Sequence, residues 1–206
     1  MLPKIRQTLF FSATMASEIR RLSDQFLLNP KQISVAPPAS PAKTVQQRVV
    51  RSASDAKTKR ATLRALLDRE GEEIKGALVF CNRKRDVDIV KRSLARHGYD
   101  AECLHGDMPE PARMETLNRF RRSEIRILVC SDVAARGLDI PAVSHVFNYD
   151  VPSNPEDYVH RIGRTGRAGR SGKAYMLLPR DDDKQMANVR KLIGINIEEE
   201  KLSGAP

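Results

Sequence analysis

The stretch from His160 to Arg170, HRIGRTGRAGR, holds four arginines and three glycines in eleven residues. Glycine lets the backbone pass close to a ligand, and each arginine presents a planar fork of N–H donors that matches two phosphate oxygens. A basic tract of this kind can also be a solvated surface loop. The residue types therefore indicate a phosphate-binding loop, with a solvated loop as the alternative.

A second polar cluster favours the phosphate-binding alternative. The segment CSDVAARGLDIPAV, Cys130–Val143, follows the apolar run 125–129, so a serine, two aspartates and an arginine stand where a buried strand is expected to end. In open parallel sheets, ligands bind at the carboxyl ends of the strands. This cluster therefore has the position expected of a ligand site.

Together the two clusters resemble motifs V and VI of the DEAD-box RNA helicases, and other motifs of that family occur in the expected order. They are SAT at Ser12–Thr14 (motif III), ALVFCNRK at Ala77–Lys84 (motif IV), and LHGDM followed by Arg113 (the QxxR element). The His-Arg opening of HRIGRTGR favours the DEAD-box branch over the DEAH branch. The resemblance covers almost the whole chain.

The elements that must position these motifs alternate between apolar strand-like runs and amphipathic helical segments. Strands are expected at 45–50, 77–81, 101–104, 125–130, 143–148 and 173–178, and helices at 55–69, 86–97, 112–121, 155–162 and 181–193. Such alternation predicts an α/β domain with a mostly parallel sheet covered by helices on both faces. This architecture matches the RecA-like domain that the resemblance implies.

The chain before this domain has a different composition. Residues 15–28 are predicted to form an amphipathic helix, too small to fold alone, and the next fifteen residues contain four prolines, which is typical of an extended linker. The resemblance implies that residues 1–28 are the C-terminal fragment of a first RecA-like, ATP-binding domain. It further implies an interdomain linker at 29–43, the helicase C-terminal RecA-like domain at 44–195 and a short tail at 196–206. The sequence leaves open whether Met1 is a true start.

Composition narrows the partners. Lysine and arginine number 36 against 26 acidic residues, which gives a net charge of +10, so nucleic acid is the first partner to expect. There is no tryptophan and no cationic amphipathic helix with aromatic anchors, so we expect no membrane role.

The cysteines and one His-Gly-Asp sequence have structural interpretations. Cys81, Cys103 and Cys130 lack the spacing of a metal site, and we expect buried thiols, no bound metal and a cytoplasmic protein. His105-Gly106-Asp107 is predicted to form a turn and not a catalytic pair.

The resemblance assigns this chain one half of a composite ATPase site. The sequence contains no GxxxxGK[ST] loop and no acidic pair for Mg²⁺, so ATP with Mg²⁺ is implied to bind a first domain that is not included. Arg164 and Arg167 are implied to be arginine fingers for the γ-phosphate, and Asp139 to contact the ribose. His160 and Arg161 complete the expected catalytic set by tying this loop to the first domain. The resemblance further implies that Ser12, Ala13 and Thr14 couple the nucleotide state to closure of the two domains.

RNA is implied to lie across both domains, held through phosphates and 2′-hydroxyls. The residues expected to contact it are Asn82 and Arg83 from motif IV, Arg113 from the QxxR element, and Ser131, Arg136 and Gly137 from motif V. Glu110 stands at the usual glutamine position, and because its carboxylate would repel phosphate we leave it out. For Arg113 the alternative is a helix-surface ion pair with Glu110.

The sequence as a whole predicts the C-terminal half of a DEAD-box ATP-dependent RNA helicase, a monomer whose partners are RNA and its own first RecA-like domain. Two alternatives stay open. The chain is a freestanding RNA-binding module or an inactive truncation product, or it belongs to a related DNA helicase or translocase.

Overall fold

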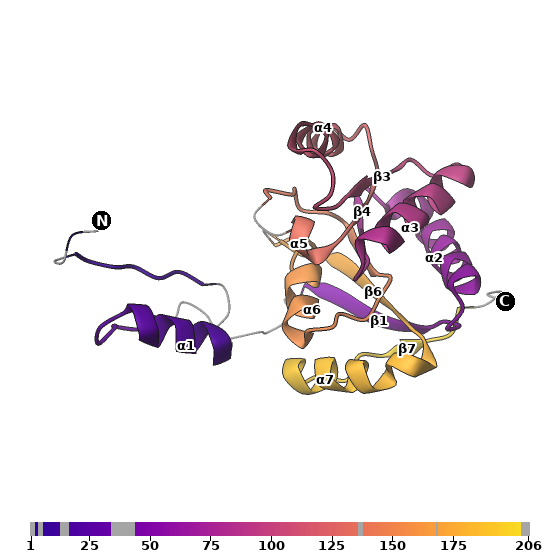
Figure 1. Cartoon of the computed structure of the whole chain (residues 1–206). Helices are drawn as coiled ribbons and strands as arrows, with labels where there is room; N and C mark the ends of the chain where they lie inside the picture. Colours follow the sequence, from indigo (N-terminus) through magenta and orange to yellow (C-terminus); the bar gives the residue numbers. More distant parts are fainter. Residues whose placement is uncertain are drawn as a thin grey trace. The chain divides into compact units, whose positions relative to one another are not determined.

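The computed structural model describes residues 3, 6–12, 17–33, 44–135, 138–167 and 169–202, and the chain divides into two compact units, Met1–Ser40 and Pro41–Pro206 (Figure 1). The first unit contains helix α1 (Ser17–Phe26). Its exposed large apolar side chains are Leu9, Phe10, Phe11, Leu22, Phe26, Leu28 and Ile33. This unit therefore buries little apolar surface, as expected for a segment too small to form its own core.

The second unit is built on one parallel sheet. Its strands are β1 (Val45–Arg51), β2 (Ala77–Phe80), β3 (Ala101–Leu104), β4 (Ile127–Cys130), β5 (His145–Asn148), β6 (Gly172–Leu178) and β7 (Glu199–Glu200). They pair in the order β3-β4-β2-β5-β6-β1-β7. The helices are α2 (Ala56–Glu70), α3 (Lys84–Arg96), α4 (Glu110–Arg121), α5 (Asp132–Ala135), α6 (Pro155–Ile162) and α7 (Asp183–Ile193), with 3₁₀ turns η1 (Gly71–Glu73) and η2 (Arg180–Asp182).

Helices cover both faces of the sheet, which confirms the predicted fold class. One core cluster joins α2 and α3 to the sheet through residues such as Leu66, Val87 and Leu94. The other joins α4, α5, α6 and α7 to the opposite face through residues such as Phe120 and Tyr158. No helix within the described residues is both long and apolar enough to cross a bilayer.

Two elements were not predicted. Helix α5 has only four residues, too few for a periodic pattern, and β7 consists of two glutamates. We expected residues 196–206 to be a tail, but Glu199 pairs with Val49 of β1 and Ile197 is buried. A short polar edge strand is recognised only by its backbone pairing, because its side chains carry no apolar alternation.

The topology opens a crevice at the carboxyl ends of the central strands. Strand β2 lies between β4 and β5. The chain leaves β2 for helix α3 on one face, whereas it leaves β4 and β5 for α5 and α6 on the other face. Ligands of open α/β sheets bind where such connections diverge. The strand ends near residues 81, 131 and 149 therefore form the expected site.

At the amino end of the sheet, a buried carboxylate joins three elements. Glu70 at the end of α2 is 7% exposed and accepts hydrogen bonds from Lys173 Nζ at 2.8 Å and from the Tyr175 hydroxyl at 2.7 Å. His145 Nε2 lies 3.2 Å from the same carboxylate. The Lys173 ammonium also donates to Glu73. The lysine of the Gly172-Lys173 sequence therefore binds two carboxylates of its own domain and does not act as the lysine of a phosphate-binding loop.

This network predicts a loss of stability in acid. Hydrogen bonds from Lys173, Tyr175 and His145 overcome burial and hold the pKa of Glu70 at about 2, against 4.5 for a free glutamate. Burial lowers the pKa of His145 in the folded chain. Both groups bind protons more readily when unfolded, so stability falls as pH drops from 7, first through His145 and then, between pH 4.5 and 2, through Glu70.

The Glu70 contribution is about 3 kcal/mol, because one pKa unit corresponds to about 1.4 kcal/mol. Urea denaturation at pH 7, 5 and 3 measures the part that is lost above pH 3, about 2 kcal/mol. The Glu70→Gln protein is expected to show a flatter profile below pH 5, and Glu73→Gln, which changes an exposed carboxylate on the same lysine, is the matched control. An equally steep acid loss in Glu70→Gln would contradict the assignment.

Candidate functional site

Arg161 joins the ends of three strands. Its guanidinium is 1% exposed and binds Asp132 in bidentate fashion, with Nε–Oδ1 at 2.7 Å and Nη2–Oδ2 at 2.6 Å. It also donates to Asn82 Oδ1 at 2.8 Å and to the Asp150 carbonyl at 2.7 Å. These acceptors stand after β4, β2 and β5, so Arg161 holds together the loops that carry motifs IV, V and VI.

We expected Arg161 to belong to the catalytic set, and the structure corrects this. The same guanidinium also reaches Asn148 Oδ1 at 3.4 Å and lies over the Phe80 ring. The donors of Arg161 are directed to acceptors of its own domain and its side chain is enclosed, so its contacts here hold loops in place. It is a positioning residue.

The loop after α6 is fastened by a buried threonine and two glycines. The Thr165 hydroxyl bonds the Val143 carbonyl at 2.6 Å, and Thr44 Oγ1 donates to the Gly166 carbonyl at 2.9 Å. Gly166 has φ +67°, and a Cβ there would lie 2.5 Å from Val45. A Cβ on Gly172 would meet Thr165 Oγ1 at 2.1 Å. The glycines therefore allow the loop to lie against the start of β1, which fixes the backbone on both sides of Arg164 and Arg167.

Arg164 and Arg167 form a pair of cations without a carboxylate partner. Within the described residues neither makes an ion pair: Arg164 Nη2 donates to the Ala135 carbonyl at 3.4 Å, and Arg167 Nε donates to the Gly163 carbonyl. Burial and then the nearby Arg167 lower the pKa of Arg164. Arg167 is exposed. Two close guanidiniums that repel each other are suited to an anion with several negative oxygens.

Asp139 lies close enough to this pair to act on it, because its charge partly offsets the fall in the pKa of Arg164. Its side chain is 97% exposed, and its backbone is held by Arg121 Nη2, which donates to the Asp139 carbonyl at 2.7 Å. The predicted ribose ligand and the two predicted fingers therefore share one region of the surface, open to solvent.

The other predicted residues differ in their placement. His160 is partly exposed, and its Nδ1 lies 3.8 Å from Asp157 Oδ1. The Ser131 hydroxyl and Arg113 Nε are both buried without a hydrogen-bond partner in the described part of the chain. The alternative ion pair of Arg113 with Glu110 is not formed within the described residues, where Arg113 Nε is buried without a partner.

Motif IV contributes mainly structure. The Asn82 amide donates to the Val151 carbonyl at 2.9 Å and its oxygen accepts from Arg161, while Arg83 is exposed at the start of α3. Ser12 is exposed. Ala13, Thr14, Arg136 and Gly137 lie outside the described residues.

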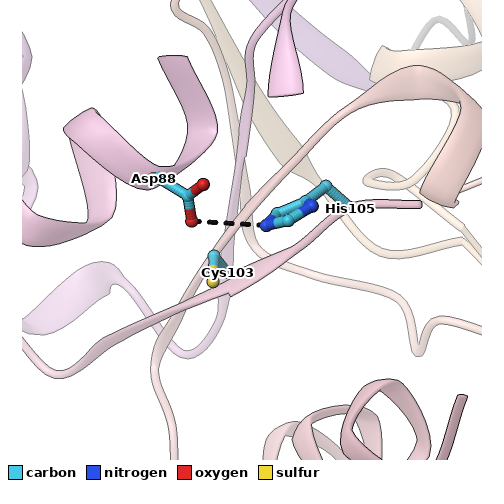
Figure 2. Close-up of side chains that lie close together, drawn as sticks. All are labelled: Asp88, Cys103 and His105. Atoms are coloured by element: carbon cyan, nitrogen blue, oxygen red, sulfur yellow. Dashed lines mark hydrogen bonds and ion pairs between the residues drawn. The ribbon is translucent and has the colours of Figure 1, made fainter. Parts of the chain in front are cut away.

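The His-Gly-Asp sequence forms the expected turn, and a small cluster lies beside it. Figure 2 shows His105 turned toward Asp88 of α3, with Nε2 and Oδ1 3.3 Å apart, and Cys103 below them. Asp107 pairs with Lys84. A carboxylate, a thiol and an imidazole thus come within 4.8 Å of one another. Burial and then Asp88 raise the pKa of the Cys103 thiol, which disfavours the thiolate that a metal requires.

The thiol predictions hold for two of three cysteines. Cys81 and Cys130 are buried, and burial raises the pKa of each. Cys103 is only half-buried, so that prediction was wrong. The reason is its place on β3, which lies at the edge of the sheet.

Sequence reasoning missed the partners of Arg161. Asp132 lies inside the quoted CSDVAARGLD segment and Asp150 follows the strand-like run 143–148, so both were visible as acidic residues at strand ends. What was lacking was the knowledge that an arginine from a later helix lies between them.

Comparison with known proteins identifies relatives. Residues 58–169 match the family model described as helicase conserved C-terminal domain. The ATP-dependent RNA helicase CshA of Listeria monocytogenes is 46% identical over 162 residues, which are 79% of this chain and 30% of that protein. The DEAD-box ATP-dependent RNA helicase CshA of Bacillus subtilis is 44% identical over 162 residues, 79% of this chain and 32% of that protein. The chain spans about a third of the length of these curated relatives.

Solved structures agree. Saccharomyces cerevisiae Dbp5 bound to RNA and ADP BeF3 is similar with a TM-score of 0.86 at 28% identity, over 98% of this chain and 53% of that one. The Escherichia coli DEAD-box protein SrmB, bound to regulator of ribonuclease activity A, is similar with a TM-score of 0.71 at 36% identity, over 76% of this chain and 90% of that one.

Proposed function

Because this chain belongs to the helicase conserved C-terminal domain family, in its DEAD-box branch, we propose that it completes the ATPase site of an ATP-dependent RNA helicase and holds part of the RNA. The observation that carries the proposal is the pair Arg164 and Arg167, two neighbouring guanidiniums on the loop between α6 and β6 that have no carboxylate partner within the described residues.

In this proposal the pair meets the γ-phosphate of an ATP held by another domain. Two forks of N–H donors neutralise the charge that develops on the transferred phosphoryl group. The mutual repulsion of Arg164 and Arg167, which lowers the pKa of Arg164, is relieved when a trianionic group lies between them. The same positive field would repel Mg²⁺, so we assign the metal to the domain that binds ATP.

Asp139 suits the ribose. Its carboxylate is exposed, acts electrostatically on Arg164 and is carried on a backbone held by Arg121. An ionised carboxylate accepts hydrogen bonds from ribose hydroxyls, while the arginines near it take the phosphates. A nucleotide aligned in this direction presents its γ-phosphate to Arg164 and Arg167.

RNA is proposed to bind beside the nucleotide, at the ends of β4 and the start of α4. The Ser131 hydroxyl and Arg113 Nε are buried polar atoms without a partner within the described residues. Leaving such atoms unpaired costs about 1–3 kcal/mol each, and because both are covered in this structure, a local shift that brings them to a ligand would recover that energy. Phosphate oxygens and 2′-hydroxyls supply the acceptors.

Arg161 couples the two sites. Its contacts tie Asp132, which directly follows Ser131, to the helix that leads into Arg164. A shift of the RNA-contacting loop is therefore transmitted to the loop that carries the fingers. The exposed apolar side chains of the first unit fit the same proposal, since in a larger ATP-binding domain they would be buried.

Mixing experiments test the division of the ATPase site. The 206-residue chain alone is expected to hydrolyse ATP at background rate, because it carries the cations but no phosphate loop. Addition of the ATP-binding domain of the same protein should restore turnover that RNA stimulates, and malachite-green phosphate release measures it. Addition of that domain together with the Arg164→Ala/Arg167→Ala chain, which keeps the buried Arg161 network, is the control. Hydrolysis by the isolated chain would overturn the proposal.

A further inference from the structure

A strongly basic groove lies between helices α2 and α3, which pack next to each other on one face of the sheet (Figure 1). Its volume is about 420 Å³. Five cationic side chains line it: Lys57, Arg60 and Arg64 from α2, and Arg92 and Arg96 from α3. No aspartate or glutamate is among its lining residues. The groove is separate from the Arg164–Arg167 pair, which lies between α6 and β6.

The five cations are not neutralised by the protein. Among the described residues, none of them makes an ion pair within 4.0 Å; Arg64 donates to the Ser93 hydroxyl at 3.3 Å and Arg92 to the Asp88 carbonyl at 3.3 Å. By contrast, Arg51, Arg69, Arg119, Arg122 and Arg190 all have carboxylate partners. The groove therefore brings together four arginines and a lysine that have no carboxylate partner in the described part of the chain.

Helical spacing places the cations in two facing rows. On α2 they stand at positions 57, 60 and 64, and on α3 at 92 and 96, the intervals that put side chains on one helix face. Like charges at these intervals cost about 0.2–0.5 kcal/mol a pair. Repulsion among the five cations therefore raises the free energy of the unbound protein, and a bound polyanion removes that repulsion.

The chemistry of the lining favours phosphates over an acidic protein segment. Arginine forks match phosphate oxygens in bidentate fashion. The one large apolar side chain in the groove is Ile89, which provides too little apolar surface for the buried anchors of a protein interface. The one ring among the lining residues is the His97 imidazole, and no phenylalanine, tyrosine or tryptophan supplies a stacking platform, so the groove recognises chiefly the backbone of a nucleic acid.

We propose that the α2–α3 groove is a second, sequence-independent RNA-binding site that holds phosphates of a strand beyond the part bound at the carboxyl edge. The identity of the polyanion as RNA rests on the proposed function. Helix α2 begins directly after the carboxyl end of β1, so the groove starts at the edge where the first site lies. From Lys57 to Arg64 the helix rises about 10 Å, the length of about three nucleotides at 3.4 Å each.

The test compares two variants that each lose two positive charges. Arg92→Gln/Arg96→Gln removes exposed groove cations, and Arg180→Gln/Lys191→Gln removes exposed cations at η2 and α7, on the other face of the sheet. Fluorescence anisotropy gives the affinity of the 206-residue chain for a 30-nucleotide single-stranded RNA over a range of KCl concentrations, without ATP. Thermal melting confirms that each variant is folded.

The groove variant is expected to bind on the order of ten-fold more weakly at 0.1 M KCl, with the slope of log affinity against log salt reduced by about 1.4, since each lost phosphate contact on a single strand contributes about 0.7. The control variant should stay within about two-fold of the original chain. Equal RNA affinities of the two variants would overturn the proposal that the groove binds RNA and would leave the proposed function unaffected. Failure of the unaltered chain to bind RNA would overturn both. Poly-glutamate is measured in the same way as a second probe. If the groove variant lost affinity for poly-glutamate and kept its affinity for RNA, the groove would bind an acidic protein segment, and the proposal would be overturned.

Discussion

Replacing Arg167 by alanine in the helicase that carries this chain is expected to lower ATP hydrolysis by about 10³- to 10⁵-fold, the contribution of an arginine finger in phosphoryl transfer. The physical reason is that its charge acts only when the nucleotide is held against it. The Arg167 guanidinium is exposed, and within the described residues it donates to the Gly163 carbonyl of the same loop, so the substitution should leave the fold intact.

Two measurements separate this role from RNA anchoring. Steady-state ATPase at saturating RNA should fall in Arg167→Ala, while RNA affinity without ATP stays within about two-fold, because a lost phosphate contact would also reduce the salt dependence. Arg170→Ala, three residues along the same exposed loop, is the matched control and should keep both properties. Parallel losses of hydrolysis and RNA affinity in Arg167→Ala would show an anchor instead of a finger.

Replacing Arg161 by alanine is expected to destabilise the domain by about 3–5 kcal/mol, the usual cost of removing one partner of a buried ion pair. The side chain is 1% exposed and bonds Asp132, Asn82 and the Asp150 carbonyl. After the substitution Asp132 keeps its charge without its partner, and the carbonyl of Asp150 loses its donor. Urea denaturation at pH 7 measures the change in the free energy of unfolding.

Conservative substitution sharpens this second prediction. Arg161→Lys keeps the charge but supplies a single ammonium in place of a planar fork, so it should recover only a small part of the lost stability. Arg170→Ala, exposed and without a carboxylate partner in the described residues, should change stability by less than about 0.5 kcal/mol. If Arg161→Ala cost no more than that control, the network would not be what holds the three strand ends together.

Much of the architecture was predictable because burial of a sheet on two faces leaves a plain pattern. Strands such as β2 and β4 are buried at every position and so appear as continuous apolar runs, and the helix over Pro155–Ile162 begins after an asparagine cap with proline in its first turn. Strand β3 and helix α6 were predicted with the bounds that the structure has. Short polar elements such as α5 and β7 left no such pattern.

Residue types and their order along the chain sufficed to indicate a phosphate-binding loop, a RecA-like α/β domain and a helicase, since fork-shaped cations, glycines and alternating apolar runs are local properties. Those local properties could not predict which arginines of the 160–170 stretch are buried in ion pairs and which stay unpaired. Arg161 is enclosed and Arg164 and Arg167 are left unpaired because carboxylates and carbonyls from β2, β4 and β5 converge on the first and not on the others. Likewise, α2 and α3 each carry an ordinary basic face, and only their packing side by side turns two faces into one groove. Long-range contacts decide which charges are neutralised, and unneutralised charge is what a ligand meets.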